Sequence, residues 1–275
     1  IAHVLTDADV SLVVAETITM AELVRAAAAS AGRESTRVLS LDTEAIRAIT
    51  EAGRSAPGSS LAERADSLTT SSIATIVYTS GTTGAPKGTV LSHGNFTDLC
   101  VNSHQWMPEI AMGRGSRLLL FLPLAHVFAR FLELFQISGE GVIGHAPDTK
   151  NLLSDLASFR PSYLLVVPRV LEKIYNSADA RAGSASARRV FRWAARIAVA
   201  YSRALDTPAG PSRALRAQRA VADRLVYQRI RTLVGGRADW IISGGAPLSQ
   251  RLAHFYRGLG IPVLEGYGLT ETVGP

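Results

Sequence analysis

The chain has few of the residues on which several common classes of site depend. Cys100 is the single cysteine among 275 residues, which excludes a disulfide framework and a cysteine-based metal site and is compatible with a reducing compartment. No apolar run reaches the roughly 18–20 residues of a membrane span, and the N-terminus lacks a signal-peptide pattern. The Gly-x-Ser-x-Gly elbow of serine hydrolases is also missing. We therefore expect a soluble protein of the cytoplasm.

Lysine is scarce too, and the positive charge is unevenly distributed. Three lysines stand against 26 arginines, and the formal net charge is +6. From Arg181 to Arg237 there are thirteen arginines, no lysine and two aspartates, so this region carries +11 and the rest of the chain −5. No recognised nucleic-acid-binding module accompanies the charge, so we do not expect nucleic acid as a partner.

Apolar residues recur at helical spacing inside this arginine-rich region. They are Val190, Trp193, Ala194, Ile197 and Tyr201. The spacing predicts an amphipathic helix with its apolar stripe against the protein body and its arginines in solvent. A second interpretation is peripheral contact with anionic lipid at a membrane surface, which basic amphipathic helices can make.

The most informative segment present is Thr79–Gly88, Thr-Ser-Gly-Thr-Thr-Gly-Ala-Pro-Lys-Gly, which follows the apolar run Ile73–Tyr78. The apolar run predicts a buried strand. Glycines let backbone N–H groups approach anionic oxygens, hydroxyls add donors and lysine adds a point charge, so the loop suits a polyphosphate. Its candidate ligand-binding residues are Thr79, Ser80, Gly81, Thr82, Thr83, Gly84 and Lys87. Lys87 stands between Pro86 and Gly88, which disfavours the P-loop of phosphotransferases, where Ser or Thr follows Gly-Lys.

Strand and helix patterns alternate along the chain, with a connector at about 53–72. Strands are predicted at 10–15, 37–41, 73–78, 89–91, 117–122, 162–167, 239–243 and 262–265. Helices are predicted at 20–31, after Asp42, at 95–106, over most of 169–234 with a break near 207–211, and at 249–259. This alternation indicates an α/β fold of layered, doubly wound sheets with helices on both faces. Ligands of such sheets bind at the carboxyl ends of strands.

Three of these strands end in polar or glycine-rich turns, after Tyr78, Ile242 and Leu264. The second turn is Ser243–Pro247, Ser-Gly-Gly-Ala-Pro, and the third is Glu265–Glu271, Glu-Gly-Tyr-Gly-Leu-Thr-Glu. A fourth segment, Leu122–Phe128, contains His126. In this order the four segments resemble the AMP-forming adenylate synthetases, which comprise acyl-CoA synthetases, luciferases and peptide-synthetase adenylation domains.

The resemblance implies roles for individual residues, with ATP, Mg²⁺ and coenzyme A as cofactor or co-substrates. The loop Thr79–Lys87 would hold the β- and γ-phosphates, with Thr82 and Lys87 taking part in catalysis. Thr79 and Glu271 would hold Mg²⁺, and Thr270 would contact the α-phosphate. Gly244, Gly245 and Ala246 would line the adenine pocket, with Tyr267 stacking on the ring, and Glu265, Gly266 and Gly268 would be further cofactor-binding residues. His126 would lie near the carboxylate under attack and the thiol entry path.

Within that family, the segment Val167–Tyr175 and the helical insertion at about 176–235 resemble the long-chain acyl-CoA synthetases, which makes a fatty acid the expected substrate. Some members place a tryptophan gate four residues after the motif histidine, where this chain has Arg130. A fatty-acyl-AMP ligase that serves a carrier protein and a non-catalytic nucleotide-binding protein on the same fold are alternatives. An amino-acid-selecting adenylation domain is disfavoured because such domains lack the Val167–Tyr175 type of segment and the insertion.

The resemblance also implies a domain organisation. Residues 1–72 would belong to a first α/β subdomain and connector, and residues 73–275 to the nucleotide- and acyl-binding α/β subdomain. The chain begins at Ile1 without an initiator methionine and stops at Pro275 inside a functional turn, so we expect it to be part of a longer protein. The C-terminal domain of the family, with its adenylation lysine, would lie outside it. These residues alone are therefore expected to be inactive.

Overall fold

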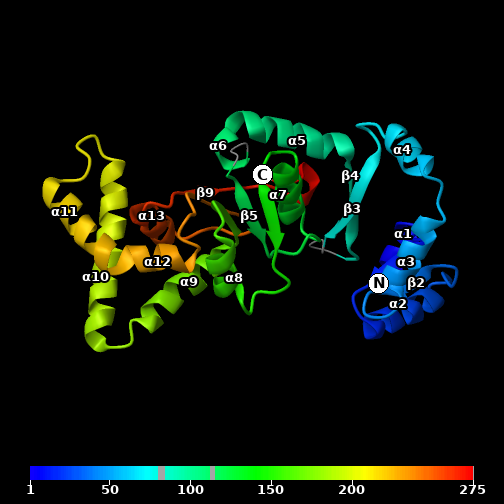
Figure 1. The fold of residues 1–275 in the computed structure, drawn as a ribbon, viewed down its shortest axis with the longest axis horizontal. Coiled ribbons are helices and arrows are strands. Elements are labelled where there is room, and N and C mark those ends of the chain that lie inside the picture. The colour runs from blue at the N-terminus through cyan, green and yellow to red at the C-terminus, as the bar shows by residue number, and fades with distance from the viewer. Residues whose placement is uncertain (80–83, 112–114, 275) are drawn as a thin grey trace. The chain divides into compact units, whose positions relative to one another are not determined.

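A computed structural model describes residues 1–79, 84–111 and 115–274, which form two compact units (Figure 1). The first unit is Ile1–Thr97 and the second is Asp98–Pro275, with the division inside helix α5. Among the residues described, none of the helices combines the length and the hydrophobicity that a membrane span requires.

The first unit contains a parallel strand pair and an antiparallel hairpin. Its elements are α1 (Ala2–Asp7), β1 (Leu12–Ala15), α2 (Ile18–Ser30), β2 (Arg37–Ser40), α3 (Ala45–Arg54), α4 (Ser59–Asp66), β3 (Ile73–Thr79), β4 (Lys87–Ser92) and the start of α5 (His93–Trp106). β1 and β2 are parallel, and a small core forms where Leu5 of α1 packs with Ala21 and Val24 of α2. β3 and β4 pair antiparallel from Ile73 opposite Ser92 to Thr79 opposite Lys87.

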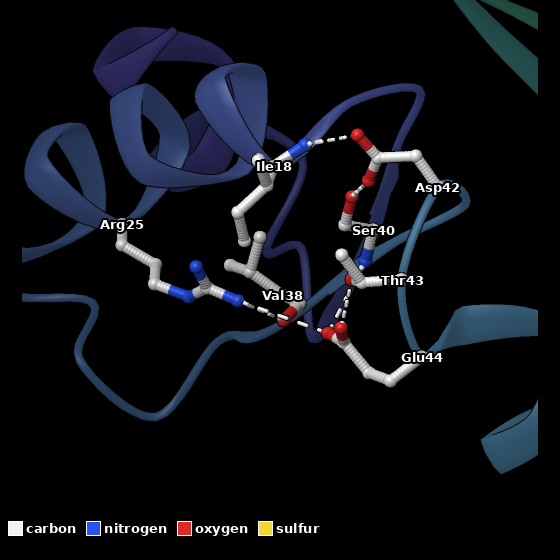
Figure 2. Close-up of polar contacts among 7 residues, drawn as sticks. All are labelled: Ile18, Arg25, Val38, Ser40, Asp42, Thr43 and Glu44. Carbon is white, nitrogen blue, oxygen red and sulfur yellow. Dashed lines mark hydrogen bonds and ion pairs between the residues drawn. The ribbon is translucent and has the colours of Figure 1, made fainter.

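Polar contacts hold the turn after β2 against α2 (Figure 2). One carboxylate oxygen of Asp42 accepts the Ile18 amide at the start of α2, at 3.1 Å, and the other accepts the Ser40 hydroxyl. The hydroxyl bond first, and then the amide bond, lower the pKa of Asp42. Arg25 of α2 donates to the Val38 carbonyl at 3.1 Å. A carboxylate at a helix N-terminus is favourable because the helix dipole is positive there, so this turn anchors β2 to α2.

The second unit is built on a sheet in which, among the described residues, five parallel strands lie in the order β6-β5-β7-β8-β9. The strands are β5 (Arg117–Leu120), β6 (Val142–His145), β7 (Tyr163–Val166), β8 (Trp240–Ser243) and β9 (Val263–Glu265). The helices are the rest of α5, α6 (Pro108–Ala111), α7 (Val127–Ile137), α8 (Leu152–Phe159), α9 (Pro168–Arg181), α10 (Ala185–Leu205), α11 (Arg213–Ala222), α12 (Gln228–Leu233) and α13 (Gln250–Leu259). A π-helical segment, η1 (Asp223–Tyr227), joins α11 to α12, and a 3₁₀ turn, η2 (Thr270–Thr272), follows β9.

The strands of this sheet are apolar on both faces, and each face has its own hydrophobic core. Leu164 and Val166 of β7 point into the core formed with α8, α9, α10 and α13, whereas Tyr163 and Leu165 point into the core formed with α5 and α7. Alternating side chains of a parallel strand reach opposite faces, so a continuous apolar run is what a central strand requires. The order, with β6 on one side of β5 and the later strands on the other, is doubly wound. The predicted α/β architecture with helices on both faces is confirmed.

Most predicted elements are present, and three expectations need correction. The strand at 73–78 exists, but it is not buried: Ile73 is 60% and Ile76 37% exposed. Within the described parts of the chain, β3 pairs with β4 alone, in a two-stranded hairpin. The connector contains helix α4, and β6, α7 and α8 occupy a part of the chain for which no element was predicted. The helices predicted over 169–234 are found, but the apolar stripe of α10 is displaced. Its buried residues are Phe191, Ala194, Ala195, Ala198 and Ser202, whereas Val190 is 38% exposed.

Candidate functional site

Two of the glycine-rich turns leave the same edge of the second unit's sheet. β8 and β9 are adjacent and parallel, and their last residues, Ser243 and Glu265, are paired. The Gly266 amide donates to the Ser243 carbonyl at 2.8 Å, and the Gly244 amide donates to the Val166 carbonyl at the end of β7 at 3.3 Å. The segments Gly244–Ala246 and Gly266–Gly268 therefore lie together at the carboxyl edge, where ligands of doubly wound sheets bind.

The turn after β8 requires glycine for two separate reasons. A Cβ on Gly244 would lie 2.8 Å from Cε1 of Phe128, at the beginning of α7. Gly245 has φ +77°, a conformation that other residues rarely adopt, and lies beside Val167. Gly244 thus brings the first turn of α7 against the turn after β8. Sequence reasoning missed Phe128, although it stands in the motif segment Leu122–Phe128.

His126 occupies the N-cap position of α7, directly after the loop that leaves β5. Its side chain is exposed, its amide donates to the Pro123 carbonyl at 3.0 Å, and its carbonyl accepts the Arg130 amide at 3.2 Å. Nε of Arg130 donates to the Leu124 carbonyl at 3.2 Å. In the position of the tryptophan gate, this chain therefore has an arginine that holds the backbone of the loop preceding α7.

Glu265 and Tyr267 have different surroundings although both follow β9. Oε1 of Glu265 accepts the Leu248 amide at 3.2 Å and so connects the end of β9 to the turn after β8. Tyr267 is 87% exposed. Its ring is available for stacking on a planar ligand, while the Glu265 carboxylate already has a structural contact.

The segment from Gly268 to Gly274 folds back on itself. Leu269 and Gly274 form an isolated β-bridge around the η2 turn, which contains the half-buried Thr270 and the exposed Glu271. The Thr272 hydroxyl accepts the Leu269 amide at 3.0 Å and donates to the Gly274 carbonyl at 2.8 Å. Thr272 thereby fixes the turn that carries both candidate residues. Sequence reasoning missed it, although threonine near a turn commonly bonds to local backbone in this way.

The candidate phosphate-binding residues belong to the first unit. Thr79 ends β3, Lys87 begins β4, and the two are cross-strand partners; Lys87 is exposed. Gly84 has φ +113°, which explains glycine at this position. The predicted binding residues Ser80, Gly81, Thr82 and Thr83 lie outside the described residues. The meeting of Thr79 and Lys87 with the segments of the second unit in one cleft stays a prediction.

The two candidate magnesium ligands are oxygen donors, the chemical type that Mg²⁺ prefers when substrate oxygens complete its shell. Among the described residues, no group of three or more histidines, cysteines, aspartates or glutamates could hold a metal ion on its own. Glu271 is a single exposed carboxylate, and Mg²⁺ commonly takes one or two protein oxygens together with waters and substrate phosphates. Glu271 of the second unit is an oxygen donor of this kind, and so is the Thr79 hydroxyl of the first unit; that the two hold one ion stays a prediction.

The fold and the site define the second unit as a doubly wound α/β structure with a candidate nucleotide-binding edge after β8 and β9. The model of the AMP-binding enzyme family matches residues 1–275, so the chain belongs to this family.

One relative, the long-chain-fatty-acid–CoA ligase FadD15 of Mycobacterium tuberculosis, is 42% identical over 273 residues, which are 98% of this chain and 45% of the relative. The chain thus spans about half the length of this curated relative. Among solved structures, the N-terminal domain of FACL13 from Mycobacterium tuberculosis has a TM-score of 0.61 at 22% identity, over 99% of this chain and 54% of that one. ATP-bound MatB from Rhodopseudomonas palustris has a TM-score of 0.59 at 22% identity, over 99% of this chain and 43% of that one. At these identities the two structures show a shared fold.

Proposed function

We propose that this protein activates long-chain fatty acids with ATP and coenzyme A. In the first half-reaction a carboxylate oxygen attacks the α-phosphorus of ATP, and pyrophosphate leaves with the electrons of the broken α–β anhydride bond. In the second, the sulfur of coenzyme A attacks the acyl carbonyl carbon, the thioester forms and AMP leaves. The 42% identity to a long-chain-fatty-acid–CoA ligase supports this substrate class. The observation that carries the proposal is the meeting of two glycine turns at one sheet edge beside the exposed Tyr267.

The adenylation step brings two anions together, so positioning and charge neutralisation supply most of its catalysis. Lys87 would place its ammonium on the phosphates, with Thr79 and the rest of the loop through Gly84 donating hydrogen bonds. Thr270 would contact the α-phosphate, and Glu271 with Thr79 would hold Mg²⁺, which neutralises phosphate charge when bound. No protein nucleophile is needed. His126 would lie beside the acyl carboxylate.

The adenine ring would lie between the glycine turn after β8 and the ring of Tyr267. Gly245 and Ala246 are exposed there and carry no large side chain, whereas Gly244 is buried beside Phe128. Glu265, Gly266 and Gly268 belong to the turn after β9. This arrangement suits a flat base, because an exposed tyrosine face stacks on any purine.

The experiment that tests the function is acid-dependent pyrophosphate release by the full-length protein, over carboxylic acids from acetate to long-chain fatty acids. We expect release with long-chain acids and thioester formation when coenzyme A is added. Release without a thioester would favour the alternative of a fatty-acyl-AMP ligase that serves a carrier protein. ATP binding with no release for any acid would favour a non-catalytic nucleotide-binding protein.

A peripheral contact with anionic lipid is a second element of the proposal. A groove of about 1010 Å³ runs along α10, and Arg189, Arg196 and Arg203 of α10 line it with Trp193 and with Arg251 of α13. No acidic residue is among the described residues that line it. Arginines around an aromatic floor suit phosphate-bearing lipid headgroups. Sedimentation with anionic vesicles, weakened by salt and by replacing Arg196 and Arg203 with glutamine, tests this contact; binding indifferent to salt, or absent, would remove it.

A further inference from the structure

Helix α1 contacts the candidate phosphate-binding hairpin through two side chains that are one helical turn apart. Nε2 of His3 lies 2.8 Å from the Pro86 carbonyl oxygen, and the Tyr78 hydroxyl donates to Oδ2 of Asp7 at 2.5 Å. Residues four apart lie on the same helix face, so both contacts are made by one side of α1. Pro86 directly precedes Lys87, and Tyr78 directly precedes Thr79. The helix therefore holds both ends of the loop that separates the two strands.

The Tyr78 ring lies across the hairpin against Gly88, its partner on the opposite strand. A Cβ on Gly88 would lie 3.0 Å from Cζ of Tyr78 and 2.9 Å from Cγ2 of Ile76. Glycine at this position thus leaves room for the ring. The His3 ring meets the edge of Tyr78 with the centroids 6.2 Å apart and the planes at 86°. The three side chains His3, Asp7 and Tyr78 form one connected set.

The chemistry of each contact is defined by its acceptor. A carbonyl oxygen only accepts, so His3 donates from Nε2 to Pro86. The carboxylate of Asp7 accepts the Tyr78 hydroxyl and raises the pKa of Tyr78, which keeps the phenol protonated as a donor. Leu5, on α1 between the two contact residues, is buried in the core of β1, β2 and α2. The contacts therefore connect the hairpin to a packed element rather than to a loose end.

We propose that His3 and Asp7 are positioning residues for Lys87 and Thr79, with α1 acting as a brace that holds Pro86 and Tyr78, the residues directly before them. The inference rests on the proposed role of Thr79 and Lys87 in binding ATP. A binding site gains affinity when its donors are held in place before the ligand arrives, so the brace acts by preorganising Thr79 and Lys87. It acts on ATP and leaves the acyl substrate unaffected.

The test uses the full-length protein with the variants Tyr78→Phe, Asp7→Ala and their combination. Calorimetry gives the Kd of MgATP, pyrophosphate release gives kcat and both KM values, and thermal unfolding gives Tm. We expect each single variant to raise the Kd and KM for ATP about threefold, because the lost bond is exposed and affects ATP only through the positions of Thr79 and Lys87. The double variant should lose no more ATP affinity than either single variant, since both substitutions remove the same hydrogen bond. The KM for the fatty acid should not change.

His3 is tested separately, with a conservative variant and a matched control. His3→Ala should weaken ATP binding, and His3→Gln should restore part of it because a glutamine amide can donate to the Pro86 carbonyl. Asp9→Ala removes the same charge two residues after Asp7, but Asp9 pairs with Arg33 at 2.6 Å, so ATP binding should stay as in the wild type.

Three results would overturn the brace. One is an unchanged Kd for ATP in Tyr78→Phe and Asp7→Ala, with or without a lower Tm. Another is an equal rise in the KM for ATP and in the KM for the fatty acid. A wild-type protein that binds no MgATP would overturn the brace together with the proposed role of the loop. ATP binding without pyrophosphate release would instead contradict only the proposed reaction, and the calorimetric comparison would still decide on the brace.

Discussion

Thr79 and Lys87 face each other as the last cross-strand pair of the β3–β4 hairpin. Directly opposed residues of an antiparallel pair project from the same face, with their Cβ atoms about 5 Å apart. The hydroxyl and the ammonium group are therefore presented together where the chain leaves the paired strands. Such a pair can contact one anion from two sides, as the proposed role in ATP binding requires.

Replacing Lys87 by alanine should reduce adenylation about a hundredfold or more, because a phosphate contact that neutralises charge contributes a few kcal/mol to the transition state. ATP–pyrophosphate exchange by the full-length protein measures the effect, and Glu271→Ala should give a comparable loss. Lys150→Ala, another exposed lysine, is the matched control and should leave the exchange rate unchanged. Near-normal exchange in both Lys87→Ala and Glu271→Ala would contradict the site assignment.

Tyr267→Ala should raise the Kd for ATP about tenfold or more, since stacking of a base on an aromatic side chain contributes about 1–3 kcal/mol. Tyr267→Phe keeps the ring and should bind like the wild type. Folding should be unaffected because Tyr267 is 87% exposed. Trp106, which is 84% exposed on α5, provides a control: Trp106→Ala should leave nucleotide affinity unchanged. Equal affinities for Tyr267→Ala and wild type would remove the stacking role.

Glu265→Ala should lower Tm by a few degrees and weaken ATP binding, because it leaves the Leu248 amide without its acceptor and loosens the turn after β8. The bond is partly buried, so its loss should cost about 1 kcal/mol of unfolding free energy. Glu265→Gln retains a carbonyl oxygen as acceptor and should therefore lose less stability and less ATP affinity than Glu265→Ala. Thermal unfolding and calorimetry of the same preparations measure both effects. If glutamine and alanine proved equally harmful, the role of the hydrogen bond would be refuted.

Gly258→Ala should destabilise the packing of α13 on α10. The added Cβ would lie 2.2 Å from the carbonyl oxygen of Ala198, a backbone atom that cannot move aside by a rotamer change. Overpacking of this kind costs about 1–3 kcal/mol of unfolding free energy, measurable by urea denaturation. Gly53→Ala, in α3 with no atom within 4 Å of the added Cβ, should instead be neutral or stabilising by up to about 1 kcal/mol.

The ion pair between Asp223 and Arg231, at 2.7 Å, should make stability depend on acid pH. The Arg231 hydrogen bond is the largest cause that lowers the pKa of Asp223 in the folded protein. A carboxyl group with a lower pKa in the folded than in the unfolded protein stabilises the fold. This stabilisation is fully present at pH values above the unfolded pKa of about 3.9, and it is lost as the pH falls through the folded pKa. Asp223→Asn should therefore lower Tm at pH 7 but have little effect near pH 2. A variant equally destabilised at both values would show that packing, not charge, is lost.

Local patterns predicted much of the fold. The apolar runs at 117–122 and 162–167 are each followed directly by a proline, Pro123 and Pro168. Both runs contain an interior strand of the parallel sheet, β5 and β7. The run at 73–78 has the same apolar character, yet β3 is a hairpin strand, because periodicity reports a side chain's preference and not which element will cover it. The stripe on α10 was displaced for a similar reason: two adjacent faces of that helix carry apolar residues, and packing selected Phe191 over Val190.

The sequence motifs alone identified the glycine turns, Tyr267 and Lys87 as candidate site residues. They could do so because rare backbone conformations and phosphate chemistry restrict which residues can occupy those positions. Only the tertiary structure brought His3 to Pro86, 83 residues further along the chain, and Glu265 to the Leu248 amide. These partners are ordinary polar groups with no local signature. Their pairing follows from the packing of α1 on its core and of β9 beside β8, which no short stretch of residues encodes.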